Sequence, residues 1–268
     1  MRNILLLVHD DKGQEARLEA ALDLRRALAG HLICVDVSIV PESVTDYIPV
    51  GGTALLLADE QRNENLNAAR LRRRLTENHV PFDWVDATGD LATCIRDAAG
   101  LADLVVTNRQ LDSAPFPDAV DLVGKLVVDE RLPVLAVPET ARGFRVDGHA
   151  LVAWDGSPSA QAALRAAIPL LKRAGSVTLV YVDDGSIDQS LGEAVRYLAR
   201  HGIESVVRRE QATARAAEIL LIAAHSGEVD YIVMGGFGHA RAIEAIFGGA
   251  TERLLRECPV PLFLAHRR

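Results

Sequence analysis

The residues best suited to chemistry lie in two glycine-rich stretches near the end of this sequence. The first is Met234-Gly235-Gly236-Phe237-Gly238-His239, and the second is Gly248-Gly249-Ala250-Thr251-Glu252. Glycines directly after a buried strand allow a sharp turn and a close approach of the backbone to a ligand. The second stretch begins a predicted helix, where free N–H groups and the helix dipole favour anions. Together they predict a phosphate site, although closure of a turn also explains such glycines.

An acidic residue, Asp155, ends another predicted strand of the same half of the chain. Ligands of open α/β sheets bind at the carboxyl ends of the strands, so Asp155 is a candidate ligand-binding residue. It is also a candidate helix cap. The glycine pattern is neither a Walker A loop, since no Gly-Lys-[Ser/Thr] follows, nor the dinucleotide pattern that follows a first strand.

These residues need strands and helices to position them, and continuous apolar runs predict buried parallel strands. Strands alternating with helices predict an α/β fold with a parallel sheet that is covered on both faces. The first half predicts strands at Ile4–Val8, Leu32–Ile39, Phe82–Val85, Leu104–Val106 and Val134–Val137, with helices at Gln14–Ala29, Leu55–Glu77, Leu91–Ala99 and Ala119–Asp129. The second half predicts strands at Ala150–Trp154, Val177–Val182, Ile203–Val207, Tyr231–Met234 and Leu262–Ala265, with helices at Ser157–Ala174, Gln189–His201, Ala212–Ser226 and Thr251–Glu257.

The two halves repeat one pattern, which predicts domains at 1–138 and 149–268 joined by a polar linker at 139–148. Val8-His9-Asp10 matches Ala153-Trp154-Asp155, and Asp103-Leu104-Val105-Val106 matches Asp230-Tyr231-Ile232-Val233. The first half is longer by about 17 residues, which we assign to the loop Val40–Thr53. A repeat of this size indicates duplication of a whole domain.

With strand, Asp, Gly-x2-Gly-x9-Gly and Cys-Pro-Val-Pro in this order, the sequence resembles the universal stress protein family, and its two halves resemble the tandem type. The resemblance is strong for Ala150–His266 and weaker for Arg2–Pro138. It implies two tandem open parallel five-stranded sheets of strand order 3-2-1-4-5, with helices on both faces. It also implies that the halves pair through their last strands as a pseudo-dimer.

The resemblance further implies an adenine-nucleotide site, for ATP or AMP with Mg, in the second half. Gly235, Gly238 and Gly248 match the family's phosphate pattern, while Gly249 replaces a Ser or Thr and so removes one hydroxyl contact. Asp155 matches the acid near adenine and ribose, Val182 matches the position whose backbone contacts adenine, Ala153 flanks that pocket, and His239 follows the first turn toward the phosphates.

The first half lacks this pattern. Asn108 and Leu111 take the places of Gly235 and Gly238, and Val120 and Asp121 take those of Gly248 and Gly249. Leucine resists the positive φ that glycine allows. Carboxylates repel phosphate, and the acidic residues of this region are Asp112, Asp118 and Asp121. We therefore predict that the first half does not bind nucleotide in this way.

The composition narrows the function. The formal net charge of −8 argues against general binding to nucleic acid or to anionic membranes. The run Ile4–Val8 is too short for a signal peptide or a membrane span. Three scattered cysteines indicate buried, reduced thiols, and the histidines show no metal-ligand spacing. We expect a cytoplasmic protein that responds to an adenine nucleotide, acts by association, and has a possible homodimer among its states.

Other functions remain open. A non-nucleotide scaffold, or a binder of another ligand such as a lipid around Val40–Leu57, fits the degenerate motifs, and slow ATP hydrolysis ranks last. Three side-chain predictions complete the analysis. Ser157 is expected to cap a helix rather than act as a nucleophile. Arg17 lies outside the apolar stripe of its helix, and Arg70–Arg74 is expected to be a solvated face.

Overall fold

The computed structural model describes residues 1–39, 50–109, 119–183, 190–211, 216–237 and 248–267. The first half contains β1 (Asn3–Val8), α1 (Gln14–Leu28), β2 (His31–Ile39), α2 (Val50–Glu77), β3 (Phe82–Gly89), α3 (Leu91–Ala99), β4 (Leu104–Asn108), α4 (Ala119–Gly124), the π-helical turn η2 (Lys125–Asp129) and β5 (Val134–Val137). The second half contains β6 (His149–Trp154), α5 (Pro158–Leu171), β7 (Ser176–Asp183), α6 (Ser190–Arg200), β8 (Val206–Gln211), α7 (Ala216–His225), β9 (Tyr231–Gly235), α8 (Gly248–Glu257) and β10 (Leu262–Ala265).

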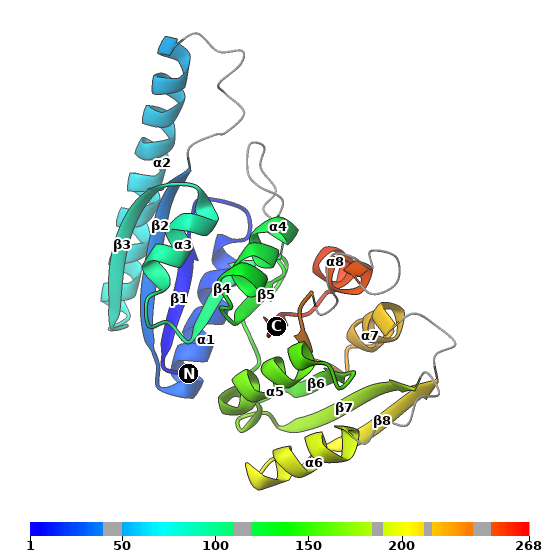
Figure 1. The fold of residues 1–268 in the computed structure, drawn as a ribbon. Helices are drawn as coiled ribbons and strands as arrows, with labels where there is room; N and C mark the ends of the chain where they lie inside the picture. The colour runs from blue at the N-terminus through cyan, green and yellow to red at the C-terminus, as the bar shows by residue number, and fades with distance from the viewer. Residues whose placement is uncertain (40–49, 110–118, 184–189, 212–215, 238–247, 268) are drawn as a thin grey trace.

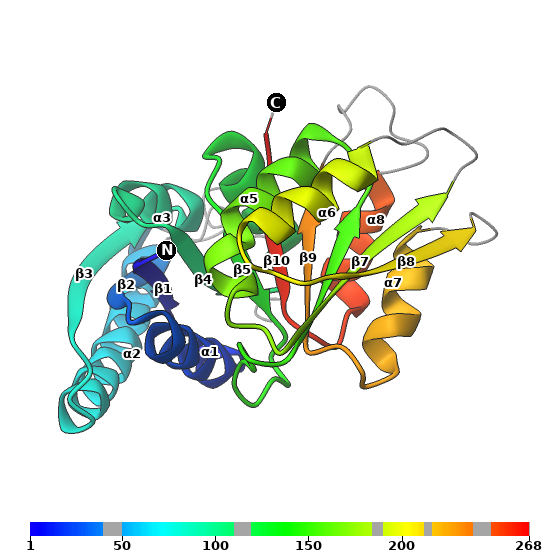
Figure 2. The ribbon, with the colours of Figure 1, turned by 90° about the horizontal axis from the view of Figure 1, so that it is seen from below.

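The strands form one sheet of ten in the order β3-β2-β1-β4-β5-β10-β9-β6-β7-β8 (Figures 1 and 2). Each half thus has the order 3-2-1-4-5 that was predicted, with all its strands parallel. The halves join where β5 and β10 run antiparallel, with Leu135 opposite Phe263. The predicted fold and the pairing through the last strands are confirmed, with the refinement that the two five-stranded sheets are continuous.

Helices cover both faces of this sheet, and the apolar core of each face runs through both halves. One cluster joins α1, α2, α5 and α6 to the sheet, and the other joins α3, α4, α7 and α8. The strands supply side chains to both, so Ile4 and Leu5 are fully buried on opposite faces. The segment between β5 and β6 also packs inward, because the Phe144 ring lies 5.0 Å from that of Tyr231.

The extra length of the first half lies mostly in α2, which has 28 residues against 11 for α6. Our assignment of that length to the loop Val40–Thr53 is wrong for Val50–Thr53, which belong to α2, and 40–49 lie outside the described residues. In Figure 1, α2 extends beyond the carboxyl ends of the strands that it covers. The strand predicted at Ile203 begins three residues later, at Val206. All three cysteines are buried and free, as predicted.

Candidate functional site

Matching hydrogen bonds at the start of each half fix which residues are equivalent. The Asn3 N–H donates to the carboxylate of Asp103 (3.0 Å), and the His149 N–H donates to that of Asp230 (2.7 Å). Counting along the strands from these bonds makes Asn108 equivalent to Gly235, as the sequence indicated. It also makes His9, not Asp10, equivalent to Asp155, so the sequence match between those two strand ends was wrong by one residue.

Asp155 lies directly after β6 with an exposed side chain. Its Oδ1 accepts a hydrogen bond from the Ser157 N–H (2.9 Å), which closes the turn into α5. Ser157 caps that helix as predicted, because its Oγ accepts from the Ala160 N–H (3.1 Å). Ala153 is partly exposed on β6, and Val182 lies near the carboxyl end of β7. This edge therefore presents a carboxylate to a ligand and keeps it out of the cap.

Gly235 ends β9 where the strand comes very close to the first turn of α5. A Cβ added at Gly235 would lie 2.6 Å from the Ala160 nitrogen and 2.7 Å from the Ser159 carbonyl carbon, so only glycine fits. The chain then turns through Phe237, whose φ is 53°, in the left-handed region. The Phe237 N–H donates to the buried Thr251 Oγ1 of α8 (3.3 Å). Gly238 and His239, both predicted site residues, lie outside the described residues.

Helix α8 begins at Gly248, as the glycine pattern predicted to within three residues. Its first turn carries no acidic residue. A Cβ added at Gly249 would meet no atom of the described residues within 4 Å. The first N–H groups of a ten-residue helix have no partner within the helix, and the dipole is positive there. This end of α8 therefore has the electrostatics and the space that an anionic group requires.

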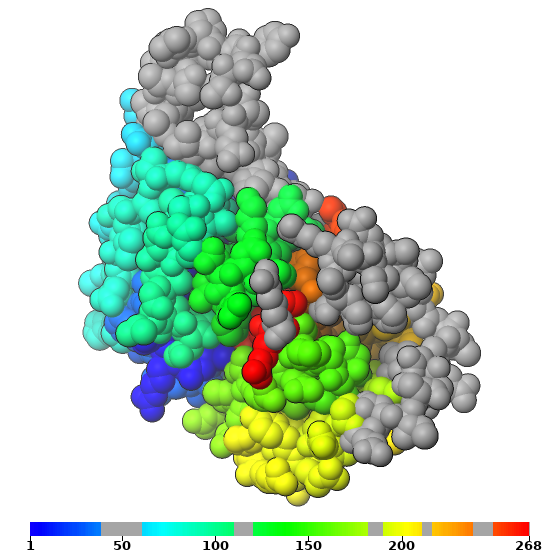
Figure 3. Space-filling model, in the orientation of Figure 1, coloured from blue at the N-terminus to red at the C-terminus, as the bar shows by residue number. Residues whose placement is uncertain are grey.

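Sequence reasoning missed one contact at this edge. The Nδ1 atom of His266 lies 2.9 Å from the Gly236 carbonyl oxygen and 3.0 Å from Ser159 Oγ. This histidine joins the end of β10 to the turn after β9 and to α5. Figure 3 shows the C-terminal residues, in red, at the surface between the two halves. A lone histidine carries no spacing signal, so the sequence offered no means of placing it.

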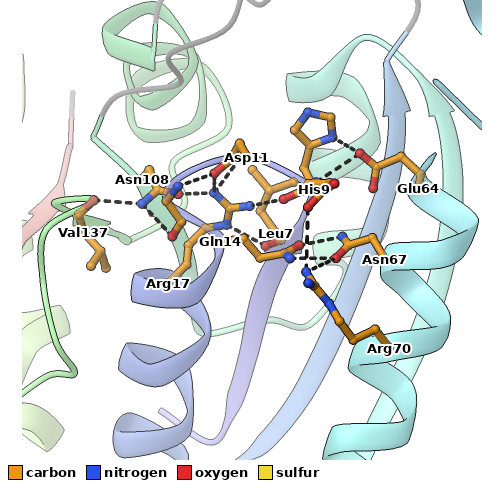
Figure 4. Close-up of polar contacts among 12 residues, drawn as sticks. Leu7, His9, Asp11, Gln14, Arg17, Glu64, Asn67, Arg70, Asn108 and Val137 are labelled. Carbon is orange, nitrogen blue, oxygen red and sulfur yellow. Dashed lines mark hydrogen bonds and ion pairs between the residues drawn. The ribbon is translucent and has the colours of Figure 1, made fainter. Parts of the chain in front are cut away.

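The equivalent edge of the first half is filled by a buried arginine. Arg17 of α1 is 0% exposed. Its Nε donates to the Leu7 carbonyl (2.9 Å), and its Nη2 donates to the His9 carbonyl (2.8 Å). Its Nη1 donates to the Asp11 carboxylate (2.8 Å to Oδ2) and to Asn108 Oδ1 (Figure 4). Burial lowers the pKa of Arg17, and Asp11 opposes that shift. The prediction that Arg17 lies outside the buried stripe was wrong.

Asn108, which replaces Gly235, completes this plug. Its Nδ2 donates to the carbonyls of Gly13 (3.1 Å) and Val137 (3.2 Å). A Cβ added at Gly13 would lie 2.3 Å from Asn108 Nδ2. Gly13 is equivalent to Ser159, so the halves exchange a glycine across one helix–strand contact. The first half places glycine on the helix and a large residue on the strand, and the second half does the reverse.

A second layer, supplied by α2, covers the plug (Figure 4). His9 Nδ1 lies 2.6 Å from Glu64 Oε1, and the side-chain amides of Gln14 and Asn67 exchange two hydrogen bonds of 2.7 Å. Burial alone would lower the pKa of His9, but the hydrogen bond and charge of Glu64 raise it overall. Burial would raise the pKa of Glu64, and His9 lowers it overall. The two side chains form an ion pair where the second half has the exposed Asp155.

The first half also touches the candidate site of the second. Arg109, next to Asn108, donates from Nη1 to the carbonyls of Leu255 (3.0 Å) and Arg256 (2.5 Å) at the end of α8. The Phe237 ring packs over Gly124, where an added Cβ would lie 3.4 Å from the ring. Asp121 lies in the first turn of α4, as predicted, whereas Leu111, Asp112 and Asp118 lie outside the described residues. The site turn and α8 therefore rest on the first half.

The molecule is thus a tandem α/β protein with one open and one filled strand edge. Residues 148–266 match the model of the universal stress protein family, and the chain belongs to this family through its second half. A universal stress protein from Archaeoglobus fulgidus has the same fold, with a TM-score of 0.75 at 19% identity over 99% of this chain and 98% of its own. A putative universal stress protein from Pseudomonas aeruginosa gives 0.63 at 16% identity over 99% and 93%. No curated protein sequence matches the chain.

Two further site types were sought in the parts of the chain that the structure describes. Within those ranges, no helix combines the length and apolar character needed to cross a bilayer. Nor do the described side chains bring together three or more histidine, cysteine or acidic residues in a geometry for a metal ion.

Proposed function

We propose that this is a cytoplasmic universal stress protein that binds an adenine nucleotide, ATP or AMP, at the open edge of its second half. The observation that carries the proposal is the contrast between the two edges. Arg17, Asn108 and Glu64 fill the edge of the first half with side chains, whereas Ala163, Gly235 and an exposed Asp155 leave that of the second half open. Membership of the family supports the nucleotide as ligand.

The physical roles follow from position. Phosphates would lie against the first N–H groups of α8 at Gly248 and Gly249, with Mg accompanying ATP. Gly235 brings the strand end close to α5 and leaves room above the sheet for the turn that follows. Asp155 would accept hydrogen bonds from the ribose hydroxyls, and Ala153 and Val182 would border the base. Losing one hydroxyl at Gly249 costs about 1 kcal/mol, which weakens phosphate binding without abolishing it.

We propose binding rather than catalysis as the outcome. Among the described residues of this edge, the groups that resemble catalytic ones already have structural partners: Ser157 caps α5, and His266 bonds Gly236 and Ser159. The bound nucleotide would act by changing how the protein associates. Arg109 and the Phe237–Gly124 contact would carry its effect to the first half and to a homodimer or other partner.

Titration calorimetry with MgATP and with AMP tests the proposal. Wild-type protein is expected to give saturable heat at submillimolar to millimolar nucleotide. Asp155→Asn keeps the acceptor for the Ser157 N–H but loses the charge, and a charge-assisted hydrogen bond of about 1.5–3 kcal/mol predicts a loss of about tenfold or more. Asp10→Asn, at an exposed carboxylate of the filled edge, is the matched control and should change nothing. The absence of heat with wild-type protein would contradict nucleotide binding and favour a scaffold.

The effector role has a separate test. Sedimentation velocity with and without MgATP measures the association state. A shift that Asp155→Asn abolishes supports nucleotide-controlled association. Binding without any shift, in the presence of a retained protein partner, contradicts control through self-association.

A further inference from the structure

A polar groove lies in the first half between β2, β3 and the adjoining part of α2, away from the open edge of the second half. Its volume is about 310 Å³. Asp36 and Ser38 line it from β2, Asp86 and Thr88 from β3, and Gln61, Asn65, Ala68, Ala69, Arg72 and Ala87 complete the wall. Figure 1 shows α2 lying along these two strands. The groove therefore offers carboxylate, hydroxyl and amide groups to a small molecule.

Two buried carboxyl groups meet at the floor of this groove. Asp36 is 6% exposed and Glu64, on the facing side of α2, is 2% exposed. Asp36 Oδ1 and Glu64 Oε2 have no hydrogen-bond partner among the described residues. Burial raises the pKa of Asp36 to about 7, and the nearby charge of Glu64 raises it further in the same direction. Two carboxylates at one buried place disfavour each other's charge.

The cations that contact this group are already engaged. His9 pairs with Glu64 at 2.6 Å. Arg72 Nη2 donates to both Asp86 oxygens (2.8 and 3.0 Å), and its guanidinium lies over the Trp84 ring at 4.4 Å from the centroid. The contacts therefore leave the carboxylate of Asp36 as uncompensated negative charge in the wall of an accessible groove. A buried charge in this situation requires a positive partner or a proton.

We propose that this groove binds a small organic ammonium compound, such as a diamine, whose –NH₃⁺ group pairs with Asp36. An ammonium carries three donors, which suit the side-chain oxygens of Ser38, Thr88 and Asn65 beside the carboxylate. A second ammonium reaches the exposed side of Asp86. Anionic ligands are repelled by Asp36, Glu64 and Asp86, so the site is chemically the opposite of the nucleotide edge.

Two features favour an ammonium over a bare metal ion. The groove is far larger than an ion needs, and its oxygens come mainly from neutral groups that accept single hydrogen bonds. The described residues also form no group of three metal-binding side chains. The proposal does not depend on nucleotide binding in the second half.

Titration calorimetry with putrescine at pH 8 and low salt tests the site. Wild-type protein is expected to bind one equivalent, and Asp36→Asn is expected to bind at least tenfold more weakly while keeping the size of the side chain. The control, Asp97→Asn, removes the same charge from the exposed surface of α3 and should bind as wild type does. Equal losses in both variants would show general charge attraction, and no saturable binding to wild type would also overturn the proposal.

Three further measurements keep the result clear. Thr88→Ala, which leaves the carboxyl pair intact, should weaken binding by about three- to fivefold through one lost hydrogen bond. Circular dichroism verifies that Asp36→Asn is folded, and if it is not, the Thr88→Ala result decides. Titration with MgCl₂ provides the metal arm: tighter binding of Mg²⁺ than of putrescine at the same place would replace the ammonium with a metal site.

Proton release distinguishes a ligand from a proton alone. The charged groups around Asp36 are Glu64 and Arg72 from α2, Asp86 from β3, and His9 at the end of β1. At pH 7 the arrival of an ammonium should expel the proton that Asp36 otherwise holds. Calorimetry in two buffers of different ionisation heat should detect that release in wild type and not in Asp36→Asn. Binding without any difference between the buffers would contradict pairing with Asp36.

Discussion

The two carboxyl edges of this sheet share one topology but are used in opposite ways. In the first half, Arg17 and Asn108 occupy the space above the strand ends and satisfy the backbone carbonyls there. In the second half, the equivalent residues are Ala163 and Gly235, and the strand ends stay accessible beside Asp155. The difference shows how a duplicated domain loses a ligand site. Side chains that donate the same kinds of hydrogen bonds as a ligand take its place.

The filled edge is held by more than one interaction. The arginine plug is satisfied by two carbonyls, a carboxylate and an amide, and the His9–Glu64 pair covers it from α2. Reopening this edge therefore requires changes on β1, α1, β4 and α2 together. The open edge needs only small residues at two positions, which makes the second half the easier one to fill and the first half the harder one to restore.

The largest expected effect comes from removing the plug. Arg17→Ala leaves the Asp11 carboxylate and two carbonyls buried without their donor, so the free energy of unfolding should fall by about 3–5 kcal/mol. Urea denaturation followed by circular dichroism measures it. The control is Arg26→Ala, at a side chain that is 72% exposed and paired only with Asp23, which should change stability by less than about 0.5 kcal/mol. Similar stabilities of the two variants would contradict the plug.

The glycine exchange predicts a coupled pair. Gly13→Ser places a Cβ 2.3 Å from Asn108 Nδ2 and should destabilise by about 1–3 kcal/mol through overpacking. In the background of Asn108→Gly the same change should be nearly neutral, which gives a coupling energy of about 1–2 kcal/mol in a double-mutant cycle. Additive effects would mean that the two positions do not share this space.

A third prediction concerns pH and applies only to the first half. The pKa of Asp36 is raised to about 7 by burial and by Glu64. A raised acid binds its proton more tightly when folded, so its contribution to stability is present at low pH and is lost as pH rises toward about 7. Asp36→Asn should therefore be more stable than wild type at pH 8, and this difference should shrink toward pH 5. Denaturant midpoints across that range, without diamine, measure it, and a pH-independent difference would be contrary.

The smallest effect sharpens the open edge. Gly249→Ser restores a hydroxyl at a position where an added Cβ meets no described atom within 4 Å. One hydrogen bond of about 1 kcal/mol should tighten MgATP binding about fivefold. The matched change in the first half, Asp121→Ser, should not create binding, because Arg17 and Asn108 still fill that edge. Calorimetry on both variants makes the comparison, with unchanged affinity in Gly249→Ser placing the phosphates elsewhere.

Much of this architecture follows from local patterns in the sequence. Continuous apolar runs such as Ile4–Val8 and Val134–Val137 give the strands, and alternation with helices gives the parallel sheets. The asymmetry of the site was also visible, because Asn108 aligns with Gly235. Gly235 needs no further signal, since a glycine that ends a buried strand indicates a close approach of backbone.

What the sequence could not give are contacts made through the backbone. Arg17 looked solvent-facing because its charge suggests water, yet its partners are the carbonyls of Leu7 and His9, which carry no side-chain signal. The one-residue error at Asp10 arose because acidic residues were matched by type, whereas the hydrogen bonds to Asn3 and His149 fix the register. The prediction of a solvated face at Arg70–Arg74 was better, since Arg70 and Arg73 are largely exposed, while Arg72 and Arg74 also make ion pairs.

The antiparallel seam between β5 and β10 also limits how copies of this chain can assemble. Of the described strands, only β3 and β8 keep a free edge, and they lie at opposite ends of the sheet. Joining β8 to a second β8 closes a twofold dimer of twenty strands, whereas joining β3 to β8 gives an open fibre. Both edges carry charged residues, with Asp83 and Asp86 on β3 and Arg208 and Arg209 on β8, a pattern that protects edge strands from unplanned growth.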